Sequence, residues 1–230
     1  KVINMLTSIP PLSDQAAIKD HIRAVLSRRD RRTIPADGLN PAAVLVPVGW
    51  LDGDPCIVLT KRSMRVETHK GEISFPGGHT EPSDNGPEAT ALREAEEEIG
   101  LKPEDVEVLG RLDDHITIFR FHVTPVVGAI PYPYPFSING EADSIVTVRL
   151  ADAFRDESWM SEKTTLRGMD VEFSCIPADE GFVWGATARI LRHFVELLVG
   201  RELITGPLSE EARTWIAGIV GAQERYNQKW

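Results

Sequence analysis

The stretch Gly77–Leu101, GGHTEPSDNGPEATALREAEEEIGL, tells more about fold and function than any other part of the sequence. Its second half has the composition of a helix that Gly100 ends, and a polar loop precedes it. Glu94, Glu97 and Glu98 are spaced i, i+3 and i+4, so a helix would project their carboxylates from one face. Such like-charged neighbours repel one another by about 0.2–0.5 kcal/mol per pair in an isolated helix. A divalent cation would offset that repulsion, because Mg²⁺ and Mn²⁺ prefer carboxylate oxygens.

A solvated acidic face is the ordinary explanation for a run of glutamates, but the flanking residues favour a binding site. Gly77 and Gly78 come just before the polar loop, and glycines let the backbone approach a metal or a phosphate without an obstructing Cβ. Arg93 can pair with Glu97 one turn further on and hold its rotamer. The opposite, buried face of this helix would be supplied by Ala91, Leu92, Ala95 and Ile99.

This stretch resembles the Nudix box, G-x5-E-x7-R-E-U-x-E-E-x-G-U, in which U is aliphatic. Residues 93–101, REAEEEIGL, fit its second half at every defined position, with Ala95 as the aliphatic residue. The first half is one residue longer than the pattern, and Asp84 or Asn85 stands where the first glutamate belongs. The resemblance implies a Nudix fold of the α/β (α+β) class. That fold is an α/β/α sandwich around a mixed β-sheet, here with N- and C-terminal helical extensions.

Segments on both sides of the box are similar to the Nudix branch that cleaves coenzyme A. The signature of this branch is L-L-T-x-R-[SA]-x3-R-x3-G-x3-F-P-G-G, and residues 58–63 and 71–78 match its two ends at the right spacing. Glu67 replaces the middle arginine, which inverts the charge where a guanidinium would suit a phosphate. Neighbouring cations that could compensate are Arg62, Arg65, His69 and Lys70. Further matches to the branch are residues 124–128, Glu141 with Leu150, and residues 184–188.

The resemblance implies a metal-dependent pyrophosphatase for a small diphosphate substrate. Mg²⁺ or Mn²⁺ would be held by Glu94, Glu97, Glu98 and the backbone of Gly77. With coenzyme A or an acyl derivative as substrate, the products would be 3′,5′-ADP and 4′-phosphopantetheine or its acyl form. The general base is assigned to Glu141, although an exposed loop carboxylate explains that residue as well, and Asp143 and Asp114 are weaker alternatives. The expected catalytic residues are Arg93, Glu94, Glu97 and Glu141, and the expected substrate-binding residues are Arg62, Ser63, His69 and Gly78.

Two other functions are compatible with the same residues. One keeps the chemistry and changes the substrate to another nucleoside diphosphate derivative, such as ADP-ribose or a dinucleotide, which Glu67 favours. The other is a Nudix-fold module that senses a nucleotide without cleaving it, although such a module has no need of its metal ligands. Tyr132, Tyr134 and Phe136 alternate with prolines and could stack on an adenine, but a rigid loop cap is the favoured interpretation.

Composition limits the class of protein further. The chain has 230 residues, and its 25 Lys+Arg against 35 Asp+Glu give a net charge of −10, which argues against nucleic acid as a partner. No apolar run approaches the roughly 20 residues that cross a bilayer, so we expect no membrane contact. Cys56 and Cys175 cannot build a disulfide framework, which favours a reduced, cytoplasmic protein. A homodimer follows only from family habit.

Hydrophobic periodicity and turn residues predict the order of elements. Helices are predicted at 13–27 with Ser13 or Asp14 as cap, at 88–99, at 185–198, and at 209–223 with Ser209 as cap. Strands are predicted at 42–48 and 56–59 as an antiparallel pair, and at 73–75, 106–112, 119–130, 145–148 and 171–176. The predicted units are a lead-in at 1–38, a Nudix domain at 39–200 and a C-terminal helix at 201–230. Four arginines after the first helix form either a basic helix end or a phosphate-attracting patch: Arg28, Arg29, Arg31 and Arg32.

Overall fold

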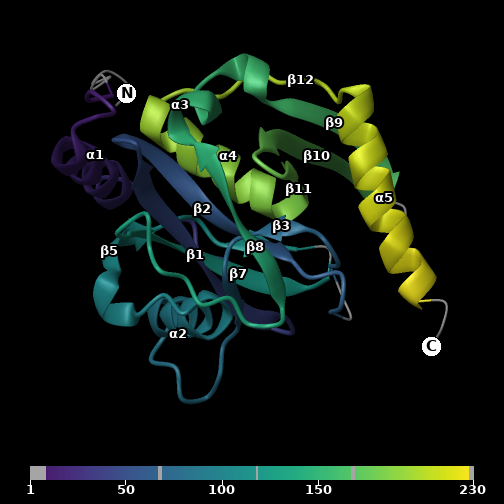
Figure 1. Ribbon diagram of the computed structural model, residues 1–230, viewed down its shortest axis with the longest axis horizontal. Coiled ribbons are helices and arrows are strands. Elements are labelled where there is room, and N and C mark those ends of the chain that lie inside the picture. The colour runs from purple at the N-terminus through teal and green to yellow at the C-terminus, as the bar shows by residue number, and fades with distance from the viewer. Residues whose placement is uncertain (1–8, 67–68, 118, 167–168, 228–230) are drawn as a thin grey trace.

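The computed structural model describes residues 9–66, 69–117, 119–166 and 169–227 (Figure 1). Its helices are α1 (Gln15–Ser27), α2 (Pro87–Ile99), α3 (Leu150–Ala153), α4 (Gly185–Val199) and α5 (Glu210–Asn227), with short 3₁₀ turns at Pro103–Asp105 and Asp156–Ser158. The first strands are β1 (Asn40–Leu51), β2 (Asp54–Arg62), β3 (Ile73–Ser74), β4 (Gly77–His79), β5 (Glu107–Arg111) and β6 (His115–Ile116). The others are β7 (Phe121–Ala129), β8 (Ala142–Arg149), β9 (Met160–Leu166), β10 (Met169–Ala178), β11 (Gly181–Trp184) and β12 (Gly206–Pro207).

Strand β1 is the centre of a mixed sheet of eight strands, the core sheet. It runs antiparallel to β2, with Val48 opposite Ile57, which confirms the predicted strand pair. It runs parallel to β7, with Leu45 opposite Val126, and it also pairs with the short strand β4. Because β4 contains the last two residues of the upstream signature, this pairing places Gly77 and Gly78 beside the central strand of the sheet.

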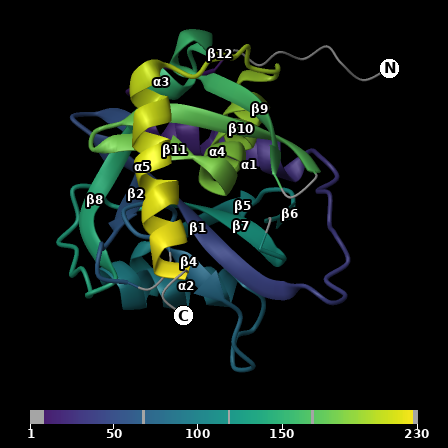
Figure 2. The same cartoon turned by 90° about the vertical axis from the view of Figure 1, so that its right-hand side faces the viewer.

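The two faces of β1 are buried against different helices, as a sandwich requires (Figure 2). Ala43 and Leu45 belong to the cluster that α2 covers, whereas Val46 and Val48 belong to the larger cluster that includes α1 and α4. All four side chains are fully buried. A strand buried on both faces reads as a nearly continuous apolar run, and residues 42–48 have that character. The predicted helix–sheet–helix layering is therefore confirmed.

A second sheet, in the strand order β11-β10-β9-β12, was not predicted beyond a single strand at 171–176. Strand β9 has the sequence MSEKTTL, whose polar residues give no apolar alternation, and β11 has only four residues. Helix α5 lies along this sheet, where Trp215 meets Phe182 with ring centroids 6.0 Å apart (Figure 1). The predicted cap of α5 is confirmed, because Ser209 Oγ accepts a hydrogen bond from the Ala212 amide at 3.1 Å.

Several predicted boundaries were wrong by a few residues. The strand predicted from residue 119 begins at Phe121, because Arg120 has a φ of 65° and its amide donates to Thr117 O in a tight turn. The strand predicted at 106–112 covers only Glu107–Arg111, since the Val106 amide closes the preceding 3₁₀ turn. Helix α1 begins at Gln15 with Asp14 as its cap. The predicted division into three units stays a prediction.

Cys56 and Cys175 are both free and fully buried, as expected for a chain without a disulfide framework. Burial raises the pKa of the Cys56 thiol to about 11 and that of Cys175 to about 12. Cys56 lies in β2 of the core sheet and Cys175 in β10 of the second sheet. Over the described part of the chain, none of the helices combines the length and apolar character that crossing a bilayer demands.

Candidate active site

Helix α2 carries the acidic residues, and local sequence explains its limits. Pro87 occupies the first turn, where its missing N–H is not needed, and Gly100 ends the helix in the left-handed conformation with a φ of 67°. Ala91, Ala95 and Ile99 are fully buried against the core sheet. This buried face fixes the rotation of the helix and so decides which way Glu94 and Glu98 point.

Arg93 clamps the loop before α2 to the helix. Its Nε and Nη2 donate to the two carboxylate oxygens of Asp84, each at 3.1 Å, and Nη2 also donates to His79 O at 2.8 Å. The Thr90 hydroxyl donates to the same carboxylate at 2.9 Å, as does the Glu81 amide. These donors hold the pKa of Asp84 far below its usual range, with the Arg93 hydrogen bonds as the main cause.

This clamp decides which residue takes the place of the first glutamate of the box. The sequence left Asp84 and Asn85 as alternatives, because the loop is one residue longer than the pattern. Only an ionised carboxylate can accept both donors of the guanidinium fork, and Asp84 does so. The extra residue of the loop therefore lets a shorter acidic side chain reach the same arginine.

Arg93 also reaches the carboxylates of α2 itself. Its Nη1 lies 3.1 Å from Glu94 Oε1 and 3.2 Å from Glu97 Oε2, which confirms the pairing predicted one turn along the helix. The Glu97 side chain is 58% exposed, whereas that of Glu94 is only 16% exposed. The helix thus directs Glu94 toward β4 and leaves Glu97 at the solvent boundary.

The two glycines of β4 make room for this arrangement. A Cβ built on Gly78 would lie 2.6 Å from Glu94 Oε1, so the absence of a side chain there lets the carboxylate approach the strand. A Cβ on Gly77 would lie 2.5 Å from Ala43 O of β1. Burial raises the pKa of Glu94, which means that the folded protein holds this carboxylate in surroundings poor in water.

Glu98 is the most buried carboxylate of α2, and its side chain is 10% exposed. The Gly77 amide donates to its Oε2 at 3.3 Å, and Arg62 Nη1 lies 3.6 Å from Oε1. The other end of the same guanidinium, Nη2, lies 3.5 Å from Glu141 Oε2. Burial raises the pKa of Glu98 to about 7, because these long contacts compensate the loss of solvent only partly.

Asn139 brings the predicted base to this place, and the sequence analysis missed its role. Its amide nitrogen Nδ2 donates to Glu97 O at 2.9 Å, and its Oδ1 accepts from the Glu141 amide at 2.8 Å. Its backbone amide also donates to Glu98 O. The Asn139-Gly140 dipeptide signals a turn, but no local pattern shows that the turn docks on the end of a distant helix.

The side chains fit a hard divalent cation, although the site is not a ready-made cage. Among the residues that the structure describes, no three His, Cys, Asp or Glu side chains converge closely enough to hold a metal ion. The donors are suitable, since Glu94 and Glu98 are largely buried carboxylates whose neighbouring positive charges only partly compensate their own. Gly78 leaves the space beside Glu94 open to backbone approach. A cation would supply the positive charge that this cluster lacks.

The structure places the other predicted site residues less favourably. Ser63 is fully buried, and its hydroxyl accepts from the Arg65 amide at 3.2 Å, so it orders its own loop. His69 lies 3.0 Å from Glu72 Oε2 and meets the ring of Phe119 edge-on. Glu67 lies outside the described residues.

The weaker candidates for a base are engaged elsewhere. Asp114 is 4% exposed and accepts hydrogen bonds from Arg31, Thr124 and the Ile34 amide, which indicates a structural role. Asp143 accepts from the Met64 amide at 3.3 Å.

The aromatic loop after β7 is a cap on the core, as the favoured interpretation held. Tyr132, Tyr134 and Phe136 are partly buried against the cluster that α2 covers. The Tyr134 hydroxyl donates to Asp105 at 2.8 Å, and its ring lies 5.1 Å from that of Phe136. These contacts satisfy the loop internally.

An acidic helix clamped by an arginine, beside a glycine turn on a mixed sheet, defines a hydrolase of the Nudix class. The profile of the NUDIX domain family matches residues 39–167, and the chain therefore belongs to the Nudix family. Members of this family cleave pyrophosphate bonds in small diphosphate substrates and typically depend on a divalent metal ion. The protein is thus a Nudix hydrolase with the Nudix α/β fold.

Individual relatives are similar at the level of the whole domain. The chain is 35% identical over 156 residues to the uncharacterized Nudix hydrolase NudL of Yersinia pestis, a match that covers 67% of this chain and 78% of that protein. The Ap4A hydrolase of C. elegans in a binary complex aligns with a TM-score of 0.42 and 21% identity, covering 50% of this chain and 84% of that one. A NUDIX hydrolase from Nitrosomonas europaea aligns with a TM-score of 0.44 and 14% identity, covering 74% and 78%.

Proposed function

We propose that this enzyme hydrolyses the pyrophosphate bond of coenzyme A or an acyl derivative, releasing 3′,5′-ADP and 4′-phosphopantetheine or its acyl form. One observation carries the choice of substrate class. Arg62 belongs to the upstream signature of the coenzyme A branch, and its guanidinium lies between Glu98 of the box and Glu141. The signature and the box therefore form a single site. Arg62 of the coenzyme A branch signature is therefore in a position to act on whatever the box cleaves.

Glu94, Glu97 and Glu98 are the side chains that would hold Mg²⁺ or Mn²⁺, with a backbone ligand from the Gly77–Gly78 turn. When bound, the cation neutralises charge on the diphosphate and makes the attacking water more acidic. Arg93 keeps Glu94 and Glu97 in place through the Asp84 clamp.

The hydrolytic step needs a water, a base and a leaving phosphate. The water oxygen attacks one phosphorus, the bond from that phosphorus to the bridging oxygen breaks, and the water proton passes to a base. Glu141 suits the part of the base because it is 57% exposed and therefore accessible to the substrate. Arg62 holds it from one side, and the Asn139 turn holds its backbone from the other. The leaving group departs as a phosphate monoester.

The test is product analysis with coenzyme A, ADP-ribose, NADH and diadenosine polyphosphates, each incubated with Mg²⁺ or Mn²⁺. We expect coenzyme A to yield 3′,5′-ADP. Glu97→Gln should lower kcat by roughly 10³-fold, as the loss of a group that stabilises charge in the transition state does. Glu96→Gln is the matched control, because Glu96 is an exposed neighbour on the same helix, and its kcat should stay within about twofold of the wild type.

The outcome also separates the two candidate substrates. Glu67 stands where the coenzyme A branch has arginine, which favours a substrate without a 3′-phosphate, such as ADP-ribose. If coenzyme A is untouched while ADP-ribose or a dinucleotide is cut, the substrate assignment is wrong and the pyrophosphatase chemistry stands. Equal kcat values for Glu97→Gln and Glu96→Gln would contradict the assigned metal ligands.

A further inference from the structure

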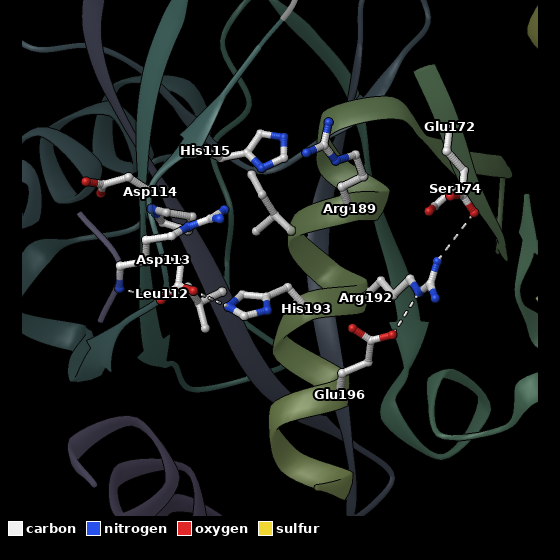
Figure 3. A pocket seen from close by; sticks show the side chains of 13 residues that line it. Leu112, Asp113, Asp114, His115, Glu172, Ser174, Arg189, Arg192, His193 and Glu196 are labelled. Atoms are coloured by element: carbon white, nitrogen blue, oxygen red, sulfur yellow. Dashed lines mark hydrogen bonds and ion pairs between the residues drawn. The ribbon is translucent and has the colours of Figure 1, made fainter. Parts of the chain in front are cut away.

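A cavity of about 480 Å³ lies between the β5–β6 edge of the core sheet and helix α4 (Figure 3). Leu112, Pro125 and Ile190 line its apolar part, and charged side chains line the remainder. Residues of the Nudix box do not line it, and α4 covers the face of the core sheet opposite α2. This cavity therefore needs an explanation of its own.

The acidic side chains of the cavity are neutralised by partners. Asp113 pairs with Arg29 and also accepts from the Arg32 amide at 3.0 Å. Asp114 pairs with Arg31. Both arginines approach from the segment after α1 and do not themselves line the cavity. This pairing accounts for half of the basic segment that follows α1.

On the α4 side, Glu196 accepts from Arg192 at 2.9 Å and from the Leu203 amide at 3.0 Å. Arg192 also lies 3.9 Å from Glu172, at the limit of an ion pair. Arg192 and Glu196 therefore neutralise each other's charge, whereas the charge of Glu172 is compensated only weakly.

Some of the cationic side chains that line the cavity are not paired with a carboxylate. Arg32 and Arg189 form no ion pair and no side-chain hydrogen bond within the described part of the chain. His193 Nε2 lies 3.4 Å from Asp113 Oδ2 without forming a hydrogen bond, so it is not among these unpaired cations. Figure 3 shows the Arg189 guanidinium beside His115, whereas His193 is turned toward Asp113. Burial lowers the pKa of His115 to about 4, and the neighbouring Arg189 adds a smaller contribution in the same direction.

An aromatic hollow of about 190 Å³ adjoins this cationic space, since the two share His115, Glu172 and Arg189. Its lining includes Phe119, Phe121, Phe173 and Trp184. The Trp184 Nε1 is buried and has no hydrogen-bond partner among the described residues. A buried indole N–H without an acceptor is unfavourable.

We propose that the cationic cavity and the aromatic hollow together bind a phosphorylated nucleoside. The phosphate would contact the guanidinium groups of Arg32 and Arg189, which are suited to bidentate recognition of phosphate oxygens. The base would stack on the aromatic rings. The ligand is either the nucleotide end of the substrate or a separate nucleotide, and both present the same chemistry. This site is independent of metal binding at α2.

The test is isothermal titration calorimetry with AMP in metal-free buffer, where the metal-dependent centre is silent. We expect one site per chain in the wild type, and at least tenfold weaker binding in Arg32→Gln and in Arg189→Gln. Glu172→Gln should bind AMP several-fold more tightly, because a carboxylate that opposes the phosphate is removed. Opposite effects of the two kinds of variant cannot come from a loss of folding. Arg155→Gln is the matched control, since Arg155 is an exposed arginine outside the cavity, and it should bind as the wild type does.

Adenosine and inorganic phosphate test the two halves of the site separately. Each should bind at least tenfold more weakly than AMP. The proposal is overturned if AMP does not bind at millimolar concentration, if the arginine variants bind like Arg155→Gln, or if phosphate alone binds as tightly as AMP. Displacement of AMP by coenzyme A in the same buffer would identify the nucleotide end of the substrate as the occupant. Simultaneous binding would identify a separate nucleotide, and both results support the site.

Discussion

Two arginine–carboxylate pairs lie on either side of α2, and they differ in almost every respect. Arg93 binds Asp84 through two hydrogen bonds of 3.1 Å, and two further donors, the Thr90 hydroxyl and the Glu81 amide, complete the carboxylate's surroundings. Arg62 lies 3.6 Å from Glu98 and shares its charge with Glu141. The pKa of Asp84 is accordingly far below its usual range, whereas that of Glu98 is raised to about 7.

The difference separates structure from function within one helix. A carboxylate whose partners fully compensate its charge has no need of a cation, and Asp84 is of this kind. Glu98 is buried yet incompletely compensated, so a divalent cation would stabilise it in the folded protein. Stability experiments should therefore give opposite signs for the two carboxylates. Activity should depend on Glu98 more directly than on Asp84.

The largest effect on the free energy of unfolding is expected from the pair of Arg93 and Asp84. Asp84→Ala should lower the free energy of unfolding by about 3 kcal/mol, because it removes the carboxylate that accepts two hydrogen bonds from the mostly buried Arg93. Asp20→Ala is the matched control, since Asp20 is 78% exposed beside Arg23, and its loss should cost less than about 0.5 kcal/mol. Denaturant unfolding at pH 7 measures both. Equal losses would show that the Asp84 clamp is no stronger than a surface pair.

The pH dependence of this loss follows from the lowered pKa of Asp84. A group of this kind contributes its stability above the pKa of the unfolded chain, near 3.9, and loses it as pH falls toward the folded value. The difference in the free energy of unfolding between the wild type and Asp84→Ala should therefore be constant from pH 5 upward and should become smaller in acid.

A smaller effect of opposite sign on the free energy of unfolding is expected at the pair of Arg62 and Glu98. Glu98→Gln should raise the free energy of unfolding of the metal-free protein by about 2 kcal/mol at pH 8, because it removes a buried negative charge. Because the pKa of Glu98 is raised, its protonated side chain contributes fully to the stability of the wild type below about pH 4.5. This contribution is lost as the pH rises through about 7. At acidic pH the free energy of unfolding of Glu98→Gln should therefore not exceed that of the wild type.

The same stability measurement, repeated with added Mg²⁺, tests whether Glu98 binds the cation. Added Mg²⁺ should stabilise the wild type by mass action and should stabilise Glu98→Gln much less. Glu96→Gln should behave as the wild type in both respects, because its carboxylate is exposed. A Glu98→Gln protein that is destabilised at pH 8 would contradict the interpretation of Glu98 as a carboxylate awaiting a cation.

The smallest change in stability is expected at the glycine turn. Gly78→Ala would place a Cβ 2.6 Å from the Glu94 carboxylate, which is the flexible end of its side chain and can move. The free energy of unfolding should fall by less than about 1 kcal/mol. Magnesium affinity, measured by calorimetry, should nevertheless fall about tenfold, because Glu94 no longer approaches the turn. Unchanged affinity would exclude this turn from the metal site.

Residues that interact along one helix were predictable from the sequence, and those that meet across the fold were less so. The pairing of Arg93 with Glu97 follows from a spacing of four residues, and the buried alanine face follows from the same periodicity. The choice between Asp84 and Asn85 needed the structure, because Asp84 keeps the spacing of the box to Gly78 and Asn85 keeps the spacing to Arg93. Asn139 was missed because its partners are about forty residues away along the chain.

The second sheet and the cationic cavity were the least predictable parts. Strand β9 has a polar sequence, and its residues 160–163 are exposed or only partly buried, so it lacks the apolar alternation that marks a strand. The basic segment after α1 left two interpretations open, a basic helix end and a phosphate-attracting patch, and neither predicted the ion pairs that the structure shows. Arg29 and Arg31 are tied to acidic partners, and Arg32 lines the cavity without an ion pair to any described side chain.

The two buried cysteines give each sheet its own reporter of opening. A thiolate is the species that reacts with alkylating agents, and both thiols are fully buried with pKa values of about 11 and about 12. Modification at neutral pH therefore requires the chain around each cysteine to open first. Because Cys56 belongs to the core sheet and Cys175 to the second sheet, pulse alkylation followed by peptide mass spectrometry would time the two openings separately within one unmutated molecule.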